Sequence, residues 1–430
     1  MPRLNALAAL WAAAATVAAP GLRVMLLLRL RRGKEAPGRL AERRGIDRTP
    51  RPPGRLVWLH AASVGETMSV LPVLASLAEA SPGATILLTT GTLTSARLLA
   101  QRLDPTLANR VLHRFVPLDV PAWAARFLDH WRPDAAGFVE SELWPNLLAA
   151  CRTRGIPVML VNGRLSDRSL ARWRRVPGTA RHLFGALARI QARSESDADR
   201  LRELGCRCVT APGDLKLAAP PLPADKAELH RLRTLLEGRP IWLAASTHPG
   251  EEALIFQVHR TLQANHPGLL TIVAPRHPER GAAIAAEAGG TAAGRRSLGE
   301  PPPADGVWIV DTLGEMGLWY RLCGIAFVGR SLIAPGGGQN PLEPARLGCA
   351  IAVGPHTGNF TDHVAMLGAA GGLAVVRDTS ELAAWVDRLL RDPAQRQAMG
   401  AAASGALQRH GDLPGRTASA LLDLLPADWA

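Results

Sequence analysis

The sequence predicts an α/β protein made of two doubly wound domains, each built on a parallel sheet, and three observations support this class. The chain has 430 residues, whereas one domain usually holds about 100–200. Short apolar segments alternate with helical segments along the chain, as expected for parallel strands joined by right-handed crossovers. A proline-rich segment at 219–223 separates two halves that each show this alternation. We therefore expect two such domains to face each other across a cleft, with the ligand at the carboxyl ends of the strands.

The predicted elements divide the chain into four parts. Residues 1–32 form an N-terminal segment with a basic flank, 33–218 the first domain, 219–226 the linker and 227–430 the second domain. Strands of the first domain are predicted at 56–60, 84–89, 113–116, 135–140, 157–162, 190–193 and 208–211. Strands of the second domain are predicted at 241–245, 270–274, 307–310, 324–328, 350–353 and 373–376.

The positive charge of the chain is concentrated at its N-terminus. The net charge is +13, and residues 1–55 contain twelve Arg or Lys against three Asp or Glu. This charge is local and flanks an apolar stretch at 4–28, which disfavours a nucleic-acid-binding face. Because the cationic cluster follows the apolar stretch, we expect an uncleaved anchor with the bulk of the chain in the cytoplasm. A cleaved signal peptide and a helix docked on its own domain remain alternatives.

The cysteines indicate neither a disulfide framework nor a zinc site. The chain has five cysteines and no CxxC pair. This low number fits a reducing compartment such as the cytoplasm.

Three turns after predicted strands have the form of a capping box. They are Ser63-x-x-Glu66, Thr312-x-x-Glu315 and Asn340-Pro341-Leu342-Glu343, the last after the glycine run 336–338. These glutamates could serve only to close helix N-termini. Alternatively, the free N–H groups of these helices could point into one crevice and bind a phosphate-bearing ligand.

Other strand ends carry ionisable side chains. Glu140 and Glu142 follow one strand, and Lys216 follows another in a chain that has only three lysines among 50 basic residues. A compact ammonium at this place suggests a point-charge role, although a plain surface position explains it equally well. His248 and His277 lie in similar turns and could be core or capping residues. The sequence contains neither GxxxxGK[ST] nor a strand-end GxGxxG, which disfavours a P-loop ATPase.

Several of these segments together resemble one enzyme family. WLHAASVGE at 58–66, ESELWPN at 140–146, NGRLSDRS at 162–169, GDLK at 213–216, ASTHPGEE at 245–252, PRHPER at 275–280 and GGGQNPLEPA at 336–345 resemble the motifs of the 3-deoxy-D-manno-octulosonic acid (Kdo) transferases. These are inverting enzymes of glycosyltransferase family 30 with the GT-B fold of two Rossmann-like domains. The resemblance extends from the N-terminal segment to about residue 378.

The resemblance implies a role for individual residues. Glu66 would be the general base, and Glu140 and Lys216 would stabilise the transition state. The first domain would bind the acceptor and the second the nucleotide sugar, CMP-Kdo. The implied nucleotide-binding residues are Pro275, Arg276, His277, Leu313, Gly314, Glu315, Asn340, Pro341, Leu342 and Glu343.

The implied function is transfer of Kdo from CMP-Kdo to a lipid A precursor (lipid IVA) in lipopolysaccharide core biosynthesis. CMP-Kdo is a substrate, so no cofactor and no metal are expected. The implied location is the cytoplasmic face of the bacterial inner membrane, where the basic flank would meet anionic lipids. Alternatives are another GT-B transferase, a nucleotide-sugar epimerase or a non-catalytic membrane-docking protein.

Overall fold

The protein is described here by a computed structural model that covers residues 6–141 and 143–425. Glu142 and the ends of the chain, 1–5 and 426–430, lie outside the described residues. The chain forms two compact units, Met1–Ala219 with Gly411–Ala430 and Pro220–His410. Each unit contains one seven-stranded parallel sheet. The predicted α/β class with two doubly wound sheets is therefore confirmed.

The sheet of the first unit has the strand order β3-β2-β1-β4-β5-β6-β7. Its strands are β1 (Leu56–Ala61), β2 (Thr85–Thr90), β3 (Val111–Phe115), β4 (Ala135–Val139), β5 (Val158–Gly163), β6 (Arg189–Ala192) and β7 (Val209–Thr210). Every residue of β1 and β4 is buried, because helices cover both faces of the sheet. This explains why both strands read as continuous apolar runs in the sequence.

Helices cover both faces of this sheet. The helices of this unit are α1 (Ala6–Arg31), which packs on α4 and α5, and α2 (Val64–Ala80), α3 (Leu93–Arg102), α4 (Pro121–Trp131), α5 (Pro145–Thr153), α6 (Asp167–Arg174), α7 (Pro177–Phe184), α8 (Glu195–Glu203) and α17 (Leu413–Leu422). Side chains of α4, α5, α7 and α8 form the core on one face. Side chains of α2, α3 and α17 form the core on the other.

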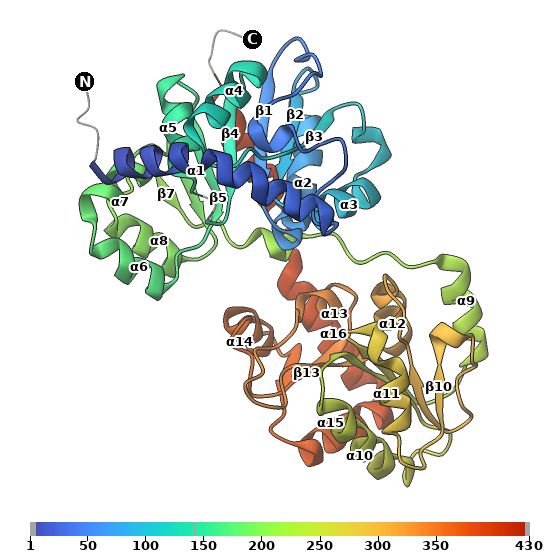
Figure 1. Ribbon diagram of the computed structural model, residues 1–430. Helices are drawn as coiled ribbons and strands as arrows, with labels where there is room; N and C mark the ends of the chain where they lie inside the picture. Colours follow the sequence, from blue (N-terminus) through green and yellow to red (C-terminus); the bar gives the residue numbers. More distant parts are fainter. Residues whose placement is uncertain (1–5, 142, 426–430) are drawn as a thin grey trace. The chain divides into compact units, whose positions relative to one another are not determined.

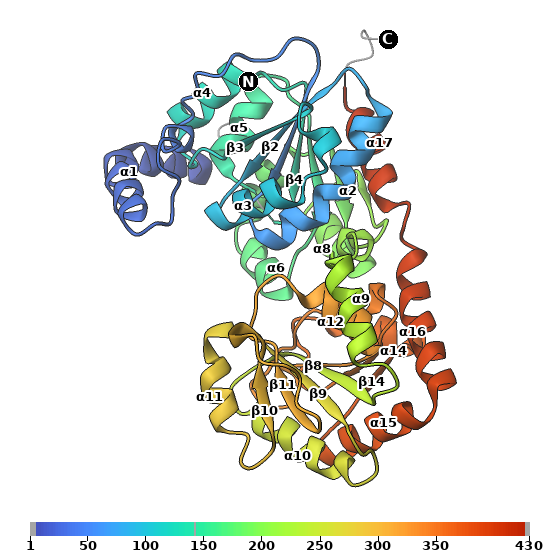
Figure 2. The ribbon, with the colours of Figure 1, turned by 90° about the vertical axis from the view of Figure 1, so that its right-hand side faces the viewer.

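The sheet of the second unit has the order β10-β11-β9-β8-β12-β13-β14. Its strands are β8 (Ile241–Thr247), β9 (Leu270–Pro275), β10 (Ala293–Arg295), β11 (Gly306–Ile309), β12 (Ile325–Val328), β13 (Ala350–Val353) and β14 (Leu373–Val375). Its helices are α9 (Lys226–Leu235), α10 (Glu251–Gln263), α11 (Gly281–Ala286), α12 (Met316–Cys323), α13 (Leu342–Arg346), α14 (Thr361–Ala369), α15 (Thr379–Arg391) and α16 (Pro393–Gln408). Helices α10 and α15 pack together on one face of this sheet, at the bottom of the view in Figure 2.

The sequence prediction missed one strand. β10 has only three residues, Ala293–Arg295, and pairs with the edge of β11. Its alanine, glycine and arginine form neither an apolar run nor an alternating pattern, so periodicity gave no signal for it.

The C-terminal helix corrects the expected end of the second domain. We expected residues 227–430 to belong to that domain, but α17 packs against α2 of the first unit, as Figure 2 shows. Leu413, Ala418 and Leu421 are buried in the core that α2 forms with the first sheet. The apolar side of this helix thus completes the first unit and leaves 220–410 as the second.

Helix α1 lies along the first unit, next to α4 and α5 (Figure 1). It is the one helix among the described residues that is long and apolar enough to cross a membrane. Only a few of its side chains are covered: Leu26 packs with Val120 and Trp123, and the Trp11 indole donates a hydrogen bond of 2.9 Å to Asp119. The helix therefore combines an exposed apolar surface with a docked edge.

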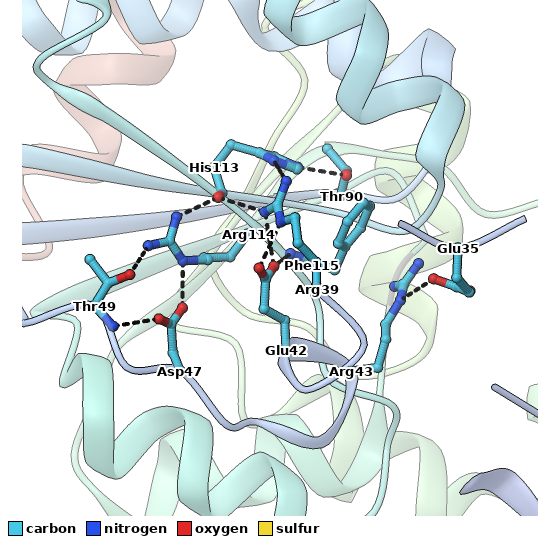
Figure 3. Close-up of polar contacts among 10 residues, drawn as sticks. All are labelled: Glu35, Arg39, Glu42, Arg43, Asp47, Thr49, Thr90, His113, Arg114 and Phe115. Atoms are coloured by element: carbon cyan, nitrogen blue, oxygen red, sulfur yellow. Dashed lines mark hydrogen bonds and ion pairs between the residues drawn. The ribbon is translucent and has the colours of Figure 1, made fainter. Parts of the chain in front are cut away.

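Ion pairs fix the segment after α1, and the pair of Asp47 with Arg114 of β3 joins this segment to the first sheet (Figure 3). Arg43 and Glu35 are both buried and lie 3.0 Å apart. Arg39 contacts Glu42 at 2.7 Å, and the guanidinium groups of Arg39 and Arg43 lie over the Phe115 ring at 4.6 and 4.7 Å. Part of the predicted basic flank therefore holds the unit together.

Other cations of the flank are exposed. They are Arg23 inside the C-terminal half of α1, and Arg31, Arg32 and Lys34 at or just after its end. This subset is available to an anionic surface.

Candidate functional site

In each sheet, the strand order reverses between two central strands. In the first unit this point lies between β1 and β4, whose register pairs His60 with Phe138. Ligands of open α/β sheets bind outside the carboxyl ends of the strands at such a point. Glu140 directly follows β4, and Glu66 lies in the first turn of α2, after β1. The fold thus places both predicted catalytic carboxylates at the switch point of the first sheet.

Glu66 closes the N-terminus of α2. Ser63 is the N-cap, and its side chain accepts a hydrogen bond from the Glu66 N–H. The Glu66 carboxylate accepts hydrogen bonds from the Ala62 N–H at 2.8 Å and from the Ser63 hydroxyl at 2.7 Å. This resembles the predicted capping box, except that the carboxylate reaches the N–H before the N-cap. A carboxylate offers about four acceptor positions, so the bonds from Ala62 and Ser63 do not by themselves prevent it from accepting a proton.

Glu140 and Lys216 form an ion pair. The Lys216 ammonium donates to Glu140 Oε1 at 2.5 Å, across 76 residues of sequence. Glu140 has φ 58°, in the left-handed region that non-glycine residues rarely adopt. Its main chain is fixed by a bond from its N–H to the Val161 carbonyl at 2.8 Å. The structure therefore joins two predicted site residues. This pairing favours a point-charge role for Lys216 over that of an ordinary surface residue.

Two side chains that were not predicted as site residues hold this lysine in place. Asn162, also in the left-handed region with φ 54°, donates to Asp214 at 3.0 Å and accepts from the Leu215 N–H at 2.9 Å. Asp214 in turn accepts from the Lys216 N–H at 2.9 Å. Both side chains are buried. The asparagine of NGR and the aspartate of GDLK thus position the turn that carries the ammonium.

A cavity of about 400 Å³ opens beside Glu140. Arg164, Ser166 and Ser169 contribute polar groups to its lining, and Trp173 and Phe184 contribute apolar surface. This volume lies within the range of about 300–1,000 Å³ that is typical of small-ligand sites. A carboxylate paired with an ammonium beside such a cavity can orient and polarise a bound ligand.

In the second unit, Glu251 organises the switch point between β8 and β12. Its carboxylate is 1% exposed and accepts four backbone hydrogen bonds. The donors are the N–H groups of His248 and Arg330 at 3.0 and 2.6 Å, and those of Ser331 and Leu332 at 2.9 and 3.1 Å. Sequence reasoning noted the HPGEE segment but assigned no role to this glutamate, which joins the loops after two strands.

The glycine run 336–338 forms a turn that other residues could hardly adopt. Its three glycines have φ values of 54°, 110° and 76°. The Gly338 N–H donates to the Arg330 carbonyl at 2.7 Å, which folds the run back onto the end of β12. This turn leads directly into the predicted Asn340–Glu343 segment.

The Asn340–Glu343 turn differs in detail from the predicted capping box. The N-cap of α13 is Pro341 and not Asn340, and no side chain caps the helix through this residue. Asn340 accepts from the Leu342 N–H at 3.1 Å and donates to Glu343 at 3.3 Å. Burial raises the pKa of Glu343, against the opposing effects of the Asn340 bond and of the Arg346 and Arg276 charges. Pro341 and Leu342 are buried, so their side chains pack in the interior and hold the turn in place.

The predicted residues after β9 lie near His248. Pro275 is buried as the last residue of the strand, whereas Arg276 and His277 are exposed. The His277 and His248 rings meet edge to face with centroids 5.8 Å apart. Burial lowers the pKa of His248, and the Gln339 amide lies 3.0 Å from its Nε2. These side chains, from the ends of β8, β9 and β12, form one polar cluster.

The predicted capping box at Thr312 is wrong. Helix α12 begins at Met316, its N-cap is Glu315, and no side chain bonds across the cap. Gly314, with φ 85°, turns the chain out of the helical path just before it. Leu313 is 81% exposed at this strand end.

Glu315 instead pairs with a distant arginine. Its carboxylate accepts bonds from Arg296 at 2.6 and 2.7 Å and also from the Thr312 hydroxyl. Burial opposes its ionisation, but the Arg296 and Thr312 bonds outweigh burial and lower the pKa of Glu315. The carboxylate thus fixes the turn that presents Leu313.

Comparisons with known proteins show one family in sequence and a shared fold in structure. Residues 38–219 match the family described as 3-deoxy-D-manno-octulosonic-acid transferase (kdotransferase). A 3-deoxy-D-manno-octulosonic acid transferase from Bordetella pertussis is 37% identical over 387 residues, which cover 88% of this chain and 89% of that protein.

Two solved structures share the fold. The UDP-GlcNAc 2-epimerase from Neisseria meningitidis has a TM-score of 0.59 and 12% identity, covering 86% of this chain and 99% of that one. A glycosyltransferase from Rickettsia africae has a TM-score of 0.56 and 10% identity, covering 87% and 99%.

Two doubly wound units, each with one parallel sheet, define an α/β protein of GT-B-like fold. The similarity in sequence narrows this class to one family. The chain belongs to the 3-deoxy-D-manno-octulosonic acid (Kdo) transferases.

Proposed function

We propose that the protein transfers Kdo from CMP-Kdo to a lipid A precursor, lipid IVA, with inversion at the anomeric carbon and with Glu66 as the general base. The observation that carries this proposal is the Lys216–Glu140 pair of 2.5 Å at the switch point that also holds Glu66. Family membership supports the sugar, and the position of these side chains supports the chemistry.

The proposed reaction is a single displacement. Glu66 accepts the proton of the acceptor hydroxyl as its oxygen attacks the anomeric carbon, and CMP leaves from the opposite face. Lys216, oriented by Glu140, stabilises negative charge that develops in the transition state. The reaction needs neither a metal nor a cofactor, because the leaving group departs as a phosphate that cationic side chains can neutralise.

The second unit supplies the proposed CMP-Kdo site. Exposed Arg276 and His277 can bind the phosphate, since a guanidinium makes charge-assisted hydrogen bonds to phosphate oxygens. Leu313 offers an exposed apolar side chain against which the cytosine ring of CMP-Kdo can pack. Asn340 and Glu343 lie in the turn after the glycine run and complete the set of polar groups.

The proposed location is the cytoplasmic face of the bacterial inner membrane. Helix α1 has the length and apolarity of a spanning or interfacial helix. Exposed Arg23, Arg31, Arg32 and Lys34 stand at its C-terminal part. Such a cluster favours an anionic lipid surface by about 1 kcal/mol per cation.

The test compares two substitutions on the same helix. Glu66→Gln removes the base and keeps both local contacts, because an amide oxygen can accept from Ala62 and an amide nitrogen can donate to Ser63. We expect kcat with CMP-Kdo and lipid IVA to fall by about 10²–10⁴-fold, with little change in thermal unfolding. Glu79→Gln, at an exposed position near the end of α2, serves as the control and should keep the wild-type rate.

Product mass measures the added sugar, and competition with UDP-sugars tests the other transferase and epimerase assignments. A Glu66→Gln enzyme as fast as the wild type would remove Glu66 from the mechanism. A wild-type protein that binds a UDP-sugar in preference to CMP-Kdo would refute the donor.

A further inference from the structure

One cavity of the first unit lies between α1 and the helices α5 and α7. It has a volume of about 780 Å³. One wall is formed by Leu7, Leu10 and Ala12 of α1, and the opposite wall by Leu148 of α5 and Leu183 of α7. Nearly all of these lining groups are apolar. A volume of this size is within the range of sites that enclose a whole small ligand.

The cavity continues along α1 past Trp11. A second apolar cavity of about 360 Å³ is lined by Ala15, Leu22 and Met25 of the same helix. Both cavities share Trp11 and Trp144 in their linings. The two together form an elongated apolar groove that follows the helix axis, and we call this the α1 groove.

Trp11 is fixed at the junction of the two cavities by a polar contact. Its indole donates to Asp119 at 2.9 Å, and Asp119 also accepts from the N–H groups of Asn146 and Leu147 at 3.2 and 2.9 Å. Asp119 therefore links Trp11, which lines the groove, to the start of α5 through hydrogen bonds. The groove is a preformed feature of the fold.

The α1 groove adjoins the cavity beside Glu140. Ser141, Leu143 and Trp173 line both the larger cavity of the groove and the Glu140 cavity. A ligand with a polar head beside Glu140 would therefore have an apolar path leading away from the site. That shape matches a lipid whose head reacts and whose chain does not.

The polar edge of the groove carries a cation. Arg152 lines the larger cavity and contacts His182 Nε2 at 3.1 Å. Because a guanidinium only donates, His182 accepts in this contact as a neutral imidazole. Burial and the Arg152 charge lower the pKa of His182, which keeps the ring neutral. Arg152 is exposed and suits an anionic group at the end of an apolar chain.

We infer that the α1 groove binds a fatty acyl chain of the acceptor lipid while the sugar of that lipid lies beside Glu140. This inference rests on the proposed function for the identity of the acceptor. The commitment to an acyl chain follows from the elongated apolar lining, the cation at its edge and the wall shared with the Glu140 cavity. The outer side of α1, with Val17 82% exposed, remains available to the bilayer from which such a lipid comes.

The first experiment measures lipid binding without any sugar transfer. Its probe is a lysophosphatidic acid, which has one acyl chain and one phosphate, held below its critical micelle concentration. Ala12→Phe fills the cavity from α1, whereas Ala13→Phe places the same side chain at a neighbouring exposed position that lines neither cavity. Since each methylene in apolar surroundings contributes about fourfold in affinity, excluding two of them should weaken binding on the order of tenfold.

We expect this loss for Ala12→Phe and not for Ala13→Phe, with glycerol phosphate unable to compete with the probe. Ala149→Phe, which fills the cavity from α5, should reproduce the loss if Ala12→Phe does not fold. Equal probe binding by folded Ala13→Phe and folded cavity-filling proteins would overturn the inference.

The second experiment identifies the lipid that uses the groove. It compares kcat/KM for the acylated acceptor with kcat/KM for the deacylated acceptor in each protein. We expect the ratio to fall about tenfold in Ala12→Phe and to stay at its wild-type value in Ala13→Phe. A weakened probe with an unchanged ratio would assign the groove to bulk membrane lipid and overturn the acceptor assignment. If the wild type transfers sugar to neither acceptor, the proposed function fails, while the binding experiment still decides whether the groove holds an acyl chain.

Discussion

Glu251→Gln should destabilise the second unit, because this carboxylate joins the loops after β8 and β12. Each of its oxygens accepts two backbone N–H groups, and the side chain is 1% exposed. Glutamine keeps one acceptor oxygen and replaces the other by an amide nitrogen, which cannot accept. Two buried N–H groups therefore lose their partner, at a cost of about 1–3 kcal/mol each.

The loss sums to about 4 kcal/mol in the middle of that range. The two bonds that remain are no longer strengthened by a negative charge, so the destabilisation should lie in the upper half of the range. The bonds also hold Arg330, at φ 56°, in a conformation that costs about 1–3 kcal/mol. For a unit of this size, about 2–4 °C of melting temperature per kcal/mol gives a decrease of about 8–16 °C.

Calorimetry of the full-length chain measures this decrease. Glu287→Gln, at an exposed position just after α11, loses the same charge and should change stability by less than about 0.5 kcal/mol. We also expect KM for CMP-Kdo to rise in Glu251→Gln, because the His248 turn loosens. A melting temperature within about 2 °C of the wild type, which corresponds to less than 1 kcal/mol, would refute the account of Glu251 as the group that joins the two loops.

Two further outcomes follow from the first unit. Asn162→Ala removes the bonds to Asp214 and to the Leu215 N–H, so we expect kcat to fall at least tenfold through misplacement of Lys216; an unchanged kcat would show that the lysine turn holds its position without Asn162. His60 is fully buried, and burial lowers its pKa from 6.5 to about 4, so the unfolded chain binds a proton that the folded chain rejects. Its stability contribution is complete above about pH 6.5 and declines as the pH falls towards 4, by about 2 kcal/mol between pH 7 and pH 5. Denaturant unfolding at both pH values should show a smaller decline for His60→Asn than for the wild type, and an equal decline would exclude His60 as the source.

Most of the two sheets could be predicted because their strands are buried on both faces. β1 and β4 appear in the sequence as continuous apolar runs, and such runs identify strands of parallel sheets. The Ser63–Glu66 turn was equally predictable, since a capping box depends on residues only three apart. Local patterns of this kind survive folding when no distant group competes for them.

The errors arose where distant groups decided the structure. The Thr312 turn has the same local pattern as the Ser63 turn, but Arg296 binds Glu315 and Gly314 delays the helix. The four donors to Glu251 include three that lie about 80 residues further along the chain. Sequence spacing does not reveal such partners.

The sequence predicted only part of the candidate site, because the rest also depends on groups that are distant in the sequence. Glu66, Glu140 and Lys216 follow strands, and the resemblance to a family drew attention to each of them. The pairing of Glu140 with Lys216 across 76 residues, and the support from Asn162 and Asp214, required the folded chain. The side chains that hold a site in place are therefore harder to predict than those that act in it.

The return of α17 to the first unit has a consequence for synthesis of the protein. The core of that unit includes Leu413 and Leu421, which leave the ribosome after the whole of 220–410. At about 5–20 residues per second, the α2 side of the first sheet stays uncovered for on the order of 10 s or longer after its own strands have emerged. The second unit can complete its core before the first does, so the part of the chain made first is the last to finish folding. A stop codon just before α17 would therefore damage the N-terminal half of the enzyme.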